Sequence, residues 1–571
     1  MMNRLTVRLL WLLAVPVVLA ACDSGFSGEQ GANLPPETEL AVRAADLTEV
    51  LSDTVAVPGD TLVMGGDTTI VDEFIVDTLR FTSLVRVNWS GTDPDGFVEA
   101  YEIRFYDARD TIGDEVGWAR TTRRDSLVLL PIPPGSPTAN VAFEVRSIDN
   151  EGAVDPTPAR TIFPVRNTPP ELRFIRAEVP PDTTWPAASF AFVAEDIDGE
   201  ANLEAIEIAL NDTTAGFVRL SAETDFVTLV AADPSAPVTE ARLLLGRSGV
   251  PTEFVLPGFL TNAQNTVYVR AVDAADFRSE TAIYPDPDPD AEERWYVQRV
   301  TSPTLLVNDY RKSRNYLILP YHREILDAYA GEGNYDEWYL VEPVQEGSSV
   351  VLEFSENLPT NPDPVLRETL RFWDAIYWVS NNATNRSVGN NLPLISNFLD
   401  AFFDDGGRLF VNVPIELPSE PEDNLGNEAF AVLPLAGLLD FGPGSEFEEY
   451  EQDMELSIGA EVTADQPLPT GNTLPTLETT RTIPLFSYPV GTGSRSVYVG
   501  DLTAELETGE ETLWPGPSTL ASLRDDNRVA LLALPLVREF NGDPYFVGAD
   551  GDPEAPQEAV RLILEALDFP R

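Results

Sequence analysis

Polar side chains end several predicted strands in the C-terminal half of this 571-residue sequence. Asp309 closes one apolar run, Asn381 and Asn382 follow a second, and Glu416 follows a third. Ligands of open α/β sheets bind at the carboxyl ends of the strands, so these four residues are candidates for a ligand cleft. A carboxylate pair such as Asp309 and Glu416 could carry out the acid/base catalysis of glycoside hydrolysis. That chemistry requires the two carboxylates to lie about 5 to 9.5 Å apart. With 94 acidic residues in the chain, chance also supplies such a pair, so no residue is assigned as catalytic.

Cysteine and histidine, which carry much of protein chemistry, each occur once, as Cys22 and His322. An internal disulfide, a Cys-x-x-Cys redox pair and a multi-histidine zinc site are therefore excluded. A serine-histidine-aspartate triad would have to use His322. Because Arg323 and Glu324 follow it, we expect His322 to be a surface or capping residue. The sequence predicts no cofactor, and it favours a non-enzymatic protein without excluding an enzyme.

Two aspartate-rich turns are candidates for binding calcium. The first contains Asp93 and Asp95, and the second contains Asp196 and Asp198; each ends in glycine. Several carboxylate oxygens from one loop suit a hard cation, but neither turn has the ligand spacing of an EF-hand. We favour the alternative of a tight turn between strands, in which glycine supplies a positive φ angle. No metal site is assigned.

The charge of the chain is strongly negative. There are 94 acidic and 37 basic residues, which gives a net charge of -57, and Lys312 is the single lysine. We predict a salt-adapted (halophilic) protein, because concentrated salt screens the self-repulsion of such a surface. Arginine-favouring codon usage would explain the scarcity of lysine but not the carboxylate excess. So negative a field makes binding to nucleic acid unfavourable.

The N-terminus has the features of an export signal. Arg4 and Arg8 precede a short apolar stretch, and residues 19–22 read Leu-Ala-Ala-Cys. Residues 1–21 are therefore predicted to be a signal peptide. The Leu-Ala-Ala-Cys ending resembles the lipobox of bacterial lipoproteins, which implies that Cys22 receives a diacylglycerol and an acyl chain such as palmitate. The alternative is an ordinary signal peptide with a chance cysteine.

Acyl chains on Cys22 would anchor the protein in the lipid bilayer. Residues 22–35 are then a flexible tether. The expected location is the cell envelope, on the extracytoplasmic side, with the choice between inner and outer membrane left open.

Residues 36–167 and 168–300 are predicted to be two similar antiparallel β-sandwiches. Short alternating apolar runs are broken by Pro, Gly, Asp and Asn, which is typical of that architecture. The aspartate-rich turn and a closing strand, residues 143–149 and 267–273, recur in both units. The pattern resembles fibronectin type III and immunoglobulin-like modules.

Residues 301–571 are predicted to form an α/β domain with a mostly parallel sheet and an insertion at about 440–525. The Asn308-Asp309 strand end, residues 373–378 and residues 403–410 carry a resemblance to the class I glutamine amidotransferase-like fold, which has a flavodoxin-type sheet. That family places a cysteine after the strand equivalent to 408–413, with a histidine further on. This sequence has neither there, so glutaminase chemistry is excluded.

Together these features predict a multidomain fold, two antiparallel β-sandwiches followed by an α/β domain. The leading hypothesis is a membrane-anchored binding or scaffold protein of the cell envelope, with a glycan, peptide or protein as ligand. The first alternative is a polysaccharide-processing hydrolase that uses carboxylates of the C-terminal domain. The second is a structural component of an envelope assembly, which an exposed apolar patch would favour.

Overall fold

The structure is a computed structural model, and it describes most of the chain from residue 32 onward. The described ranges are 32–42, 49–50, 61–64, 67–70, 80–109, 116–291, 293–310, 317–346, 349–354, 358–380, 391–415, 431–538 and 541–571. Cys22 and the predicted signal peptide lie outside them. The chain divides into two compact units, residues 1–167 and 168–571.

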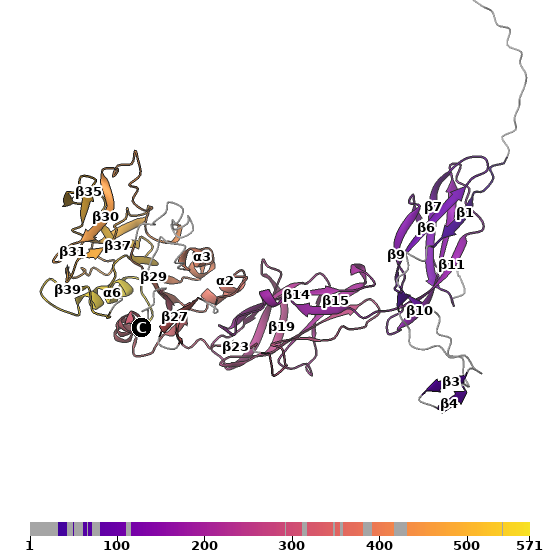
Figure 1. The fold of residues 1–571 in the computed structure, drawn as a ribbon, viewed down its shortest axis with the longest axis horizontal. Helices are drawn as coiled ribbons and strands as arrows, with labels where there is room; N and C mark the ends of the chain where they lie inside the picture. The colour runs from indigo at the N-terminus through magenta and orange to yellow at the C-terminus, as the bar shows by residue number, and fades with distance from the viewer. Residues whose placement is uncertain are drawn as a thin grey trace, which may run out of the picture. The chain divides into compact units, whose positions relative to one another are not determined.

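The first unit contains a β-sandwich, here called sandwich 1 (Figure 1). One sheet has the order β1-β6-β9, with bounds Glu37–Ala41, Leu84–Thr92 and Asp125–Leu129. The other has the order β2-β5-β11-β10-β7-β8, with bounds Glu49–Val50, Arg80–Phe81, Ala159–Arg166, Thr138–Asp149, Val98–Asp107 and Ala119–Thr121. Strands β3 (Thr61–Met64) and β4 (Asp67–Ile70) form a separate hairpin. Trp89 of β6 contacts Tyr101 and Phe143 of the facing sheet, so the two sheets share one core.

The second unit begins with sandwich 2. Its larger sheet has the order β12-β14-β17-β18-β19, with bounds Glu171–Phe174, Ala187–Glu195, Phe226–Ala231, Val238–Leu245 and Val250–Leu260. The facing sheet has the order β16-β15-β21-β22, with bounds Val218–Ser221, Leu203–Leu210, Val267–Asp273 and Ala282–Tyr284. A short sheet joins β13 (Thr183–Thr184), β23 (Tyr296–Val297) and β20 (Ala263–Gln264), and η2 (Arg176–Glu178) and η3 (Glu200–Asn202) are single turns. One hydrophobic cluster contains residues of both large sheets, which confirms the predicted sandwich.

The remainder of the second unit is built on a mixed ten-stranded sheet. In order its strands are β25 (Asp336–Tyr339), β24 (Thr304–Asp309), β28 (Ala375–Ser380), β29 (Arg408–Asn412), β38 (Val529–Leu532), β37 (Thr519–Arg524), β34 (Ser494–Gly500), β31 (Glu461–Ala464), β32 (Leu477–Thr479) and β39 (Phe546–Gly548). The pairings from β25 to β38 are parallel, and those from β38 to β39 are antiparallel.

The sheet is therefore mixed rather than mostly parallel. The reason is the segment 440–525, expected to be an insertion, which supplies β31, β32, β34 and β37 to the same sheet. It also supplies all of a four-stranded sheet, β33-β30-β35-β36, with bounds Ile483–Pro484, Tyr450–Leu456, Thr503–Leu506 and Glu511–Leu513. Strands β26 (Val341–Glu346) and β27 (Ser349–Phe354) form a hairpin.

Five α-helices accompany the ten-stranded sheet in the described part of the chain. They are α1 (Leu319–Ala330), α2 (Val365–Leu370), α3 (Leu392–Ser396), α4 (Asp400–Asp404) and α6 (Ala555–Ala566). Helix α1 contacts α6, and α2 contacts α4. Although the apolar spacing of residues 392–405 predicts one continuous helix, the structure has two short ones there, α3 and α4. None of the helices in the described part of the chain is long and apolar enough to cross a membrane.

Candidate functional site

The carboxyl end of β24, where a ligand cleft was predicted, is closed by the chain itself. Asp309 is completely buried, and its carboxylate accepts hydrogen bonds from the backbone N–H of Asn391 (2.7 Å) and from the Asn391 side-chain amide (2.8 Å). Asn391 is the N-cap residue of α3, so the carboxylate sits at the start of that helix, where a negative charge is favourable. Asp309 therefore holds α3 against the sheet.

Of the other polar residues at this edge of the sheet, the structure describes Asn412 but not the remaining predicted cleft residues. Asn412, at the end of β29, is buried and donates to the carbonyls of Leu532 and Leu534, both at 2.9 Å. It ties two parallel strands together. Asn381, Asn382 and Glu416 lie outside the described residues, so the structure does not test whether they meet Asp309. The cleft formed by these four residues stays a prediction.

His322 lies in the core, and the expectation of a surface position was wrong. It is 1% exposed on α1, and its Nδ1 is 2.9 Å from the hydroxyl of Tyr377 on β28. Burial lowers the pKa of His322 to about 3, so the imidazole is neutral at physiological pH. Tyr321, Ile325 and Leu326 are buried on the same helix, and this helical spacing was the signal that the charged neighbours obscured.

The turn of Asp93 and Asp95 fixes the segment that enters sandwich 1. The Asp95 carboxylate accepts the backbone N–H of Leu34 at 3.1 Å, and Asp149 accepts the side-chain amide of Asn33 at 2.8 Å. Burial raises the pKa of Asp93, and the charges of Asp95 and Asp149 act in the same direction. These side chains form a turn whose carboxylates bind the incoming chain.

The corresponding turn of sandwich 2 is organised in the same way. The Asp198 carboxylate is buried and accepts the backbone N–H of Thr168 at 2.9 Å. Asp196 accepts the backbone N–H of Asp198 and the side-chain amide of Asn202. Burial raises the pKa of Asp196 to about 6, with a further contribution from the charges of Asp198 and Asp273.

Calcium binding at either turn stays a prediction. Within the described residues, no group of three or more His, Cys, Asp or Glu side chains is arranged to hold a metal ion. Within each turn the first aspartate accepts the backbone N–H of the second, Asp93 from Asp95 at 3.4 Å and Asp196 from Asp198 at 2.8 Å, which is the local hydrogen bond of the tight-turn alternative.

A joint between sandwich 2 and the C-terminal domain is the most extensive feature that the sequence did not predict. Helix α2 packs on the outer face of the sheet of β14, β17 and β18, where Val365 contacts a buried cluster of Ala187, Val230 and Leu244. Strands β14 and β17 are consequently buried on both faces, by the facing sheet of the sandwich and by α2, whereas β18 and β19 keep exposed side chains. At the rim of this contact, Arg242 of β18 lies 3.4 Å from Glu368 of α2.

Aromatic and polar contacts fix the joint further. Trp185 meets Trp373 edge-to-face, with ring centroids 4.8 Å apart. The carboxylate of Asp336, which is 7% exposed, accepts the Trp373 indole N–H at 2.9 Å. It also accepts the backbone N–H of Thr301 and of Ser302, in the segment that joins the two domains. One buried carboxylate on the edge strand β25 thus links that strand to the connecting segment and to the interface tryptophan.

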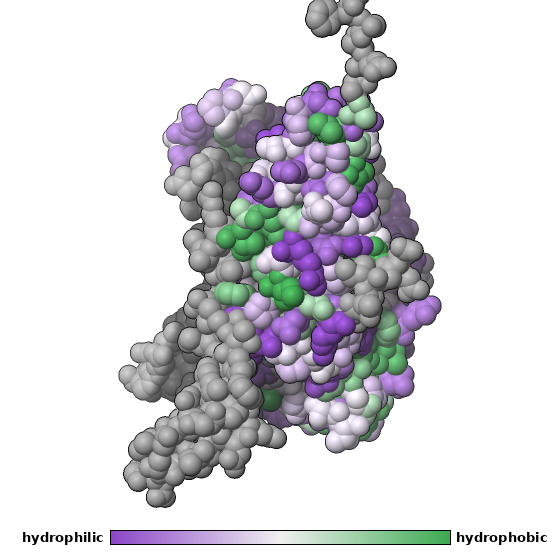
Figure 2. Space-filling model, turned by 90° about the vertical axis from the view of Figure 1, so that its right-hand side faces the viewer, coloured by the Kyte–Doolittle hydropathy of each residue, from purple (hydrophilic) through white to green (hydrophobic). Residues whose placement is uncertain are grey.

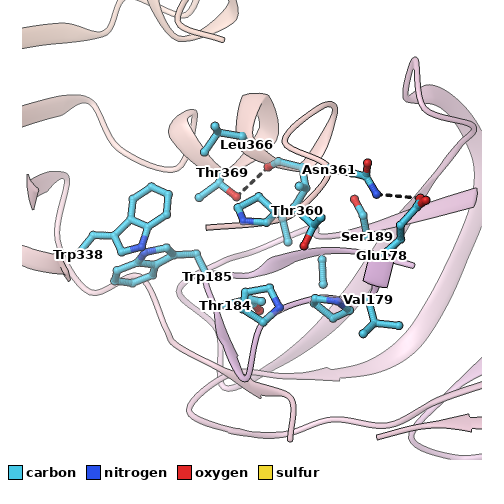
Figure 3. A pocket seen from close by; sticks show the side chains of 16 residues that line it. Glu178, Val179, Thr184, Trp185, Ser189, Trp338, Thr360, Asn361, Leu366 and Thr369 are labelled. Atoms are coloured by element: carbon cyan, nitrogen blue, oxygen red, sulfur yellow. Dashed lines mark hydrogen bonds between the residues drawn. The ribbon is translucent and has the colours of Figure 1, made fainter. Parts of the chain in front are cut away.

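A small cavity remains inside the joint, with a volume of about 30 Å³, close to the volume of one water molecule. Figure 3 shows its wall, with Trp185 and Trp338 on one side and Thr360 and Asn361 on the other. The Asn361 amide donates to Glu178 of sandwich 2 at 2.9 Å.

The joint had one signal in the sequence. Strand β14 reads Ala-Ala-Ser-Phe-Ala-Phe-Val, without the alternation of polar and apolar residues that a sheet with one wet face shows. Trp185, Asp336 and Trp373 carried no distinguishing pattern of their own.

Fold and joint together define a multidomain protein of β-sandwich modules, the second of which is fused to a domain with a mixed sheet. No protein-family profile matches the chain, and no curated protein matches it. Among solved structures, it is similar to the fibronectin(III)-like modules of Clostridium thermocellum CbhA, with 10% identity and a TM-score of 0.15 over 38% of this chain and 86% of that one. It is also similar to the FN1–FN3 domains of chicken CNTN1, with 15% identity and a TM-score of 0.15 over 40% of this chain and 66% of that one. The sandwich description rests on the strand pairing given above and not on these likenesses.

Proposed function

We propose that this protein is a lipid-anchored binding or scaffold protein of the bacterial cell envelope, without catalytic activity. The observation that carries this proposal is the joint. Trp185, Trp373 and Asp336 are buried in it, α2 packs on β14 and β17, and residues 168–571 form one compact unit, so sandwich 2 and the C-terminal domain form one body. A body fixed in this way suits the presentation of a surface to a partner better than closure over a substrate.

The anchor in this proposal is Cys22. A lipobox-like ending with the sole cysteine of the chain in the required position supports diacylglycerol attachment and export. The net charge of -57 with a single lysine supports a salt-rich environment outside the cytoplasm. The bilayer is then one partner, and a glycan, peptide or protein is the other.

The C-terminal domain is proposed to be related in fold to the amidotransferase-like proteins without sharing their chemistry. The parallel strands β25-β24-β28-β29-β38 and the helices that accompany them support that relationship. The antiparallel strands from β37 to β39 depart from it.

The hydrolase alternative loses support at Asp309. An acid/base carboxylate must reach the substrate, whereas Asp309 is fully buried and bound twice by Asn391.

The alternative of a structural assembly component would need a broad apolar surface. In sandwich 1 the exposed Phe105, Leu127 and Ile162 lie on separate strands, β7, β9 and β11. Figure 2 shows one face of the protein, on which the hydrophobic residues gather in small patches among hydrophilic ones. Neither alternative is favoured by a specific observation.

The anchoring is tested by expressing the full-length chain and its Cys22→Ala variant in the native host or a related one. The wild type is expected in the membrane fraction with a diacylglyceryl mass on its N-terminal peptide, and the variant in the soluble extracytoplasmic fraction. Equal distribution of the two proteins would contradict the proposal. The non-catalytic part fails if the purified protein turns over a polysaccharide and Asp309→Asn abolishes that turnover with an unchanged circular dichroism spectrum.

A further inference from the structure

Residues 438–447, together with Pro489 and residues 515–517, form a concave surface on the C-terminal domain. Apolar side chains line it, and its volume is about 600 Å³. We call it the Trp514 groove, after the buried tryptophan that packs behind its lining residue Phe447 and is not itself in the lining. Its apolar lining consists of Leu438, Leu439, Phe447, Pro489, Pro515 and Pro517.

The walls of the Trp514 groove are held in place by the aromatic residues behind them. The Trp514 ring lies 4.6 Å from that of Phe447 and 5.2 Å from that of Tyr450, centroid to centroid. The indole N–H of Trp514 donates to the carbonyl of Pro517 at 2.8 Å, which fixes the loop that forms one rim. Gly516 is required there, because a Cβ atom at this position would collide with the rings of Trp514 and Phe447. Such a surface loses little conformational entropy when it binds.

Two carboxylates at the edge of the groove have no arginine partner among the described residues. Asp440 and Glu446 are exposed at its edge, and neither forms an ion pair with an arginine in the part of the chain that the structure describes. One Asp440 oxygen accepts the backbone N–H of Gly442 at 2.8 Å, and this leaves the second oxygen of the carboxylate available. The Ser445 hydroxyl is buried in the lining and has no hydrogen-bond partner among the described residues.

We propose that the Trp514 groove binds a basic polypeptide segment of a partner protein, with an arginine or lysine side chain lying in the groove. The long alkyl part of such a side chain would cover the proline and leucine floor, while its charged end meets Asp440 and Glu446. The ring of Phe447, which lines the groove, can make a favourable contact with the cation. An acidic or neutral segment would leave both carboxylates without a counter-charge.

The apolar floor is what makes this surface selective in a chain whose whole exterior is acidic. In concentrated salt, charges more than about 3 Å apart are screened, so the general negative field attracts little. Ion pairs in direct contact, formed beside buried apolar area, are screened much less. The inference rests on the proposed binding role and names the chemistry of the partner.

The test uses the full mature chain and a short synthetic peptide in which arginine alternates with leucine. A matched peptide carries citrulline, which is neutral and similar in shape, at each arginine. Binding is measured by fluorescence anisotropy at low and at molar salt. We expect the arginine peptide to bind about tenfold more tightly than the citrulline peptide, and the double variant Asp440→Asn/Glu446→Gln to remove about the same factor.

The control variant is Glu507→Gln/Glu510→Gln, which changes net charge by the same amount at exposed positions outside the groove. It is expected to bind the arginine peptide as the wild type does. Equal weakening by both double variants would show attraction to the general field and would overturn the proposal, as would equal binding of the two peptides. Leu438→Ala tests the apolar floor and is expected to weaken binding a few-fold at molar salt. Cys22 lipidation, measured on the same preparations, reports on the proposed anchoring independently.

Discussion

The two sandwiches share a plan but differ in what one of their sheets does. In each, an aspartate-rich turn binds the incoming chain, and a strand pair carries an arginine against an aromatic ring: Arg146 lies 4.1 Å from Trp118, and Arg270 lies 3.9 Å from Phe217. The difference lies on the outer face of the sheet before that turn. Sandwich 1 places Arg86 there, more than half exposed and 3.7 Å from Asp125, whereas sandwich 2 places the buried Ser189.

Position for position, Arg86 and Ser189 precede their aspartate turns by the same interval. In sandwich 1 the charged Arg86 keeps the outer face of its sheet in contact with water. In sandwich 2 the small residues at the corresponding positions allow α2 to pack on the outer face. The change from an independent module to half of a fused body therefore depends on a few outward side chains and not on the fold.

Exchanging these outward residues should give the largest effect. Ser189→Arg would place an unpaired charge between β14 and α2, and we expect a loss of at least about 4 kcal/mol from the stability of the second unit, or separation of its domains. The reverse change, Arg86→Ser, should stay within about 0.5 kcal/mol. Urea unfolding followed by tryptophan fluorescence measures both. Similar effects of the two variants would show that the faces are equivalent.

The second effect concerns the buried carboxylate of the joint. Asp336→Ala removes the acceptor of the Trp373 indole and of two backbone N–H groups, so we expect a loss of about 3 kcal/mol. Hydrogen exchange of residues 301 and 302 should become faster. Asp374→Ala is the control, because Asp374 follows Trp373 in the sequence but its side chain is exposed and takes part in none of the hydrogen bonds of the joint described above. In this variant the hydrogen exchange of residues 301 and 302 should not change. Unaltered exchange in Asp336→Ala would show that the connecting segment is held by other contacts.

A smaller effect is expected at Glu144 of sandwich 1, which accepts hydrogen bonds from Tyr106 and Arg104. Burial would raise the pKa of Glu144, but these hydrogen bonds and the charges of Arg104 and Arg160 outweigh it, and the pKa is lowered. The stabilisation is present above about pH 4.5 and lost as pH falls through the folded-state value. Glu144→Gln should cost about 2 kcal/mol at pH 7 and less at pH 3. The exposed Glu99→Gln should show neither change, and a pH-independent loss in Glu144→Gln would contradict the ion-pair account.

The smallest effect should come from the turn of sandwich 2. The raised pKa of Asp196, about 6, means that the folded state binds its proton more tightly than the unfolded state does, so stability falls as pH rises from about 4 to 6. Asp196→Asn should therefore increase the free energy of unfolding at pH 7, by less than about 1 kcal/mol because the side chain is partly exposed. The melting temperature at pH 7 should rise accordingly. At pH 4 the variant and the wild type should coincide. A variant that is less stable at pH 7 would indicate that the charge of Asp196 is needed, for example by a bound cation.

The parts of the fold that the sequence predicted are those that depend on local patterns. Alternating runs and the repeated aspartate turns predicted both sandwiches, and unbroken apolar runs predicted a strand that ends at Asp309 and another that ends before Asn381, where β24 and β28 end. The same patterns misled where long-range packing decides. The strands of residues 461–524 complete the main sheet, and nothing local distinguishes such strands from those of an inserted domain.

The candidate site was predictable in position but not in state. Asp309 does lie at the carboxyl end of its strand, yet its burial depends on Asn391, which is 82 residues away in sequence. His322 shows the same limit, because its partner Tyr377 is 55 residues away. Identity and spacing show where a polar group stands along the chain, whereas its exposure is decided by distant segments.

The hydrogen bonds of Asn33 and Leu34 to sandwich 1 have a consequence for the reach of the protein. If Cys22 carries the lipid, ten residues separate the anchored cysteine from Asn33. Covalent geometry limits the end-to-end length of this ten-residue segment to about 36 Å, whatever its conformation. The first module would then stay within one domain diameter of the headgroups, and any partner of it would have to be met close to the membrane surface.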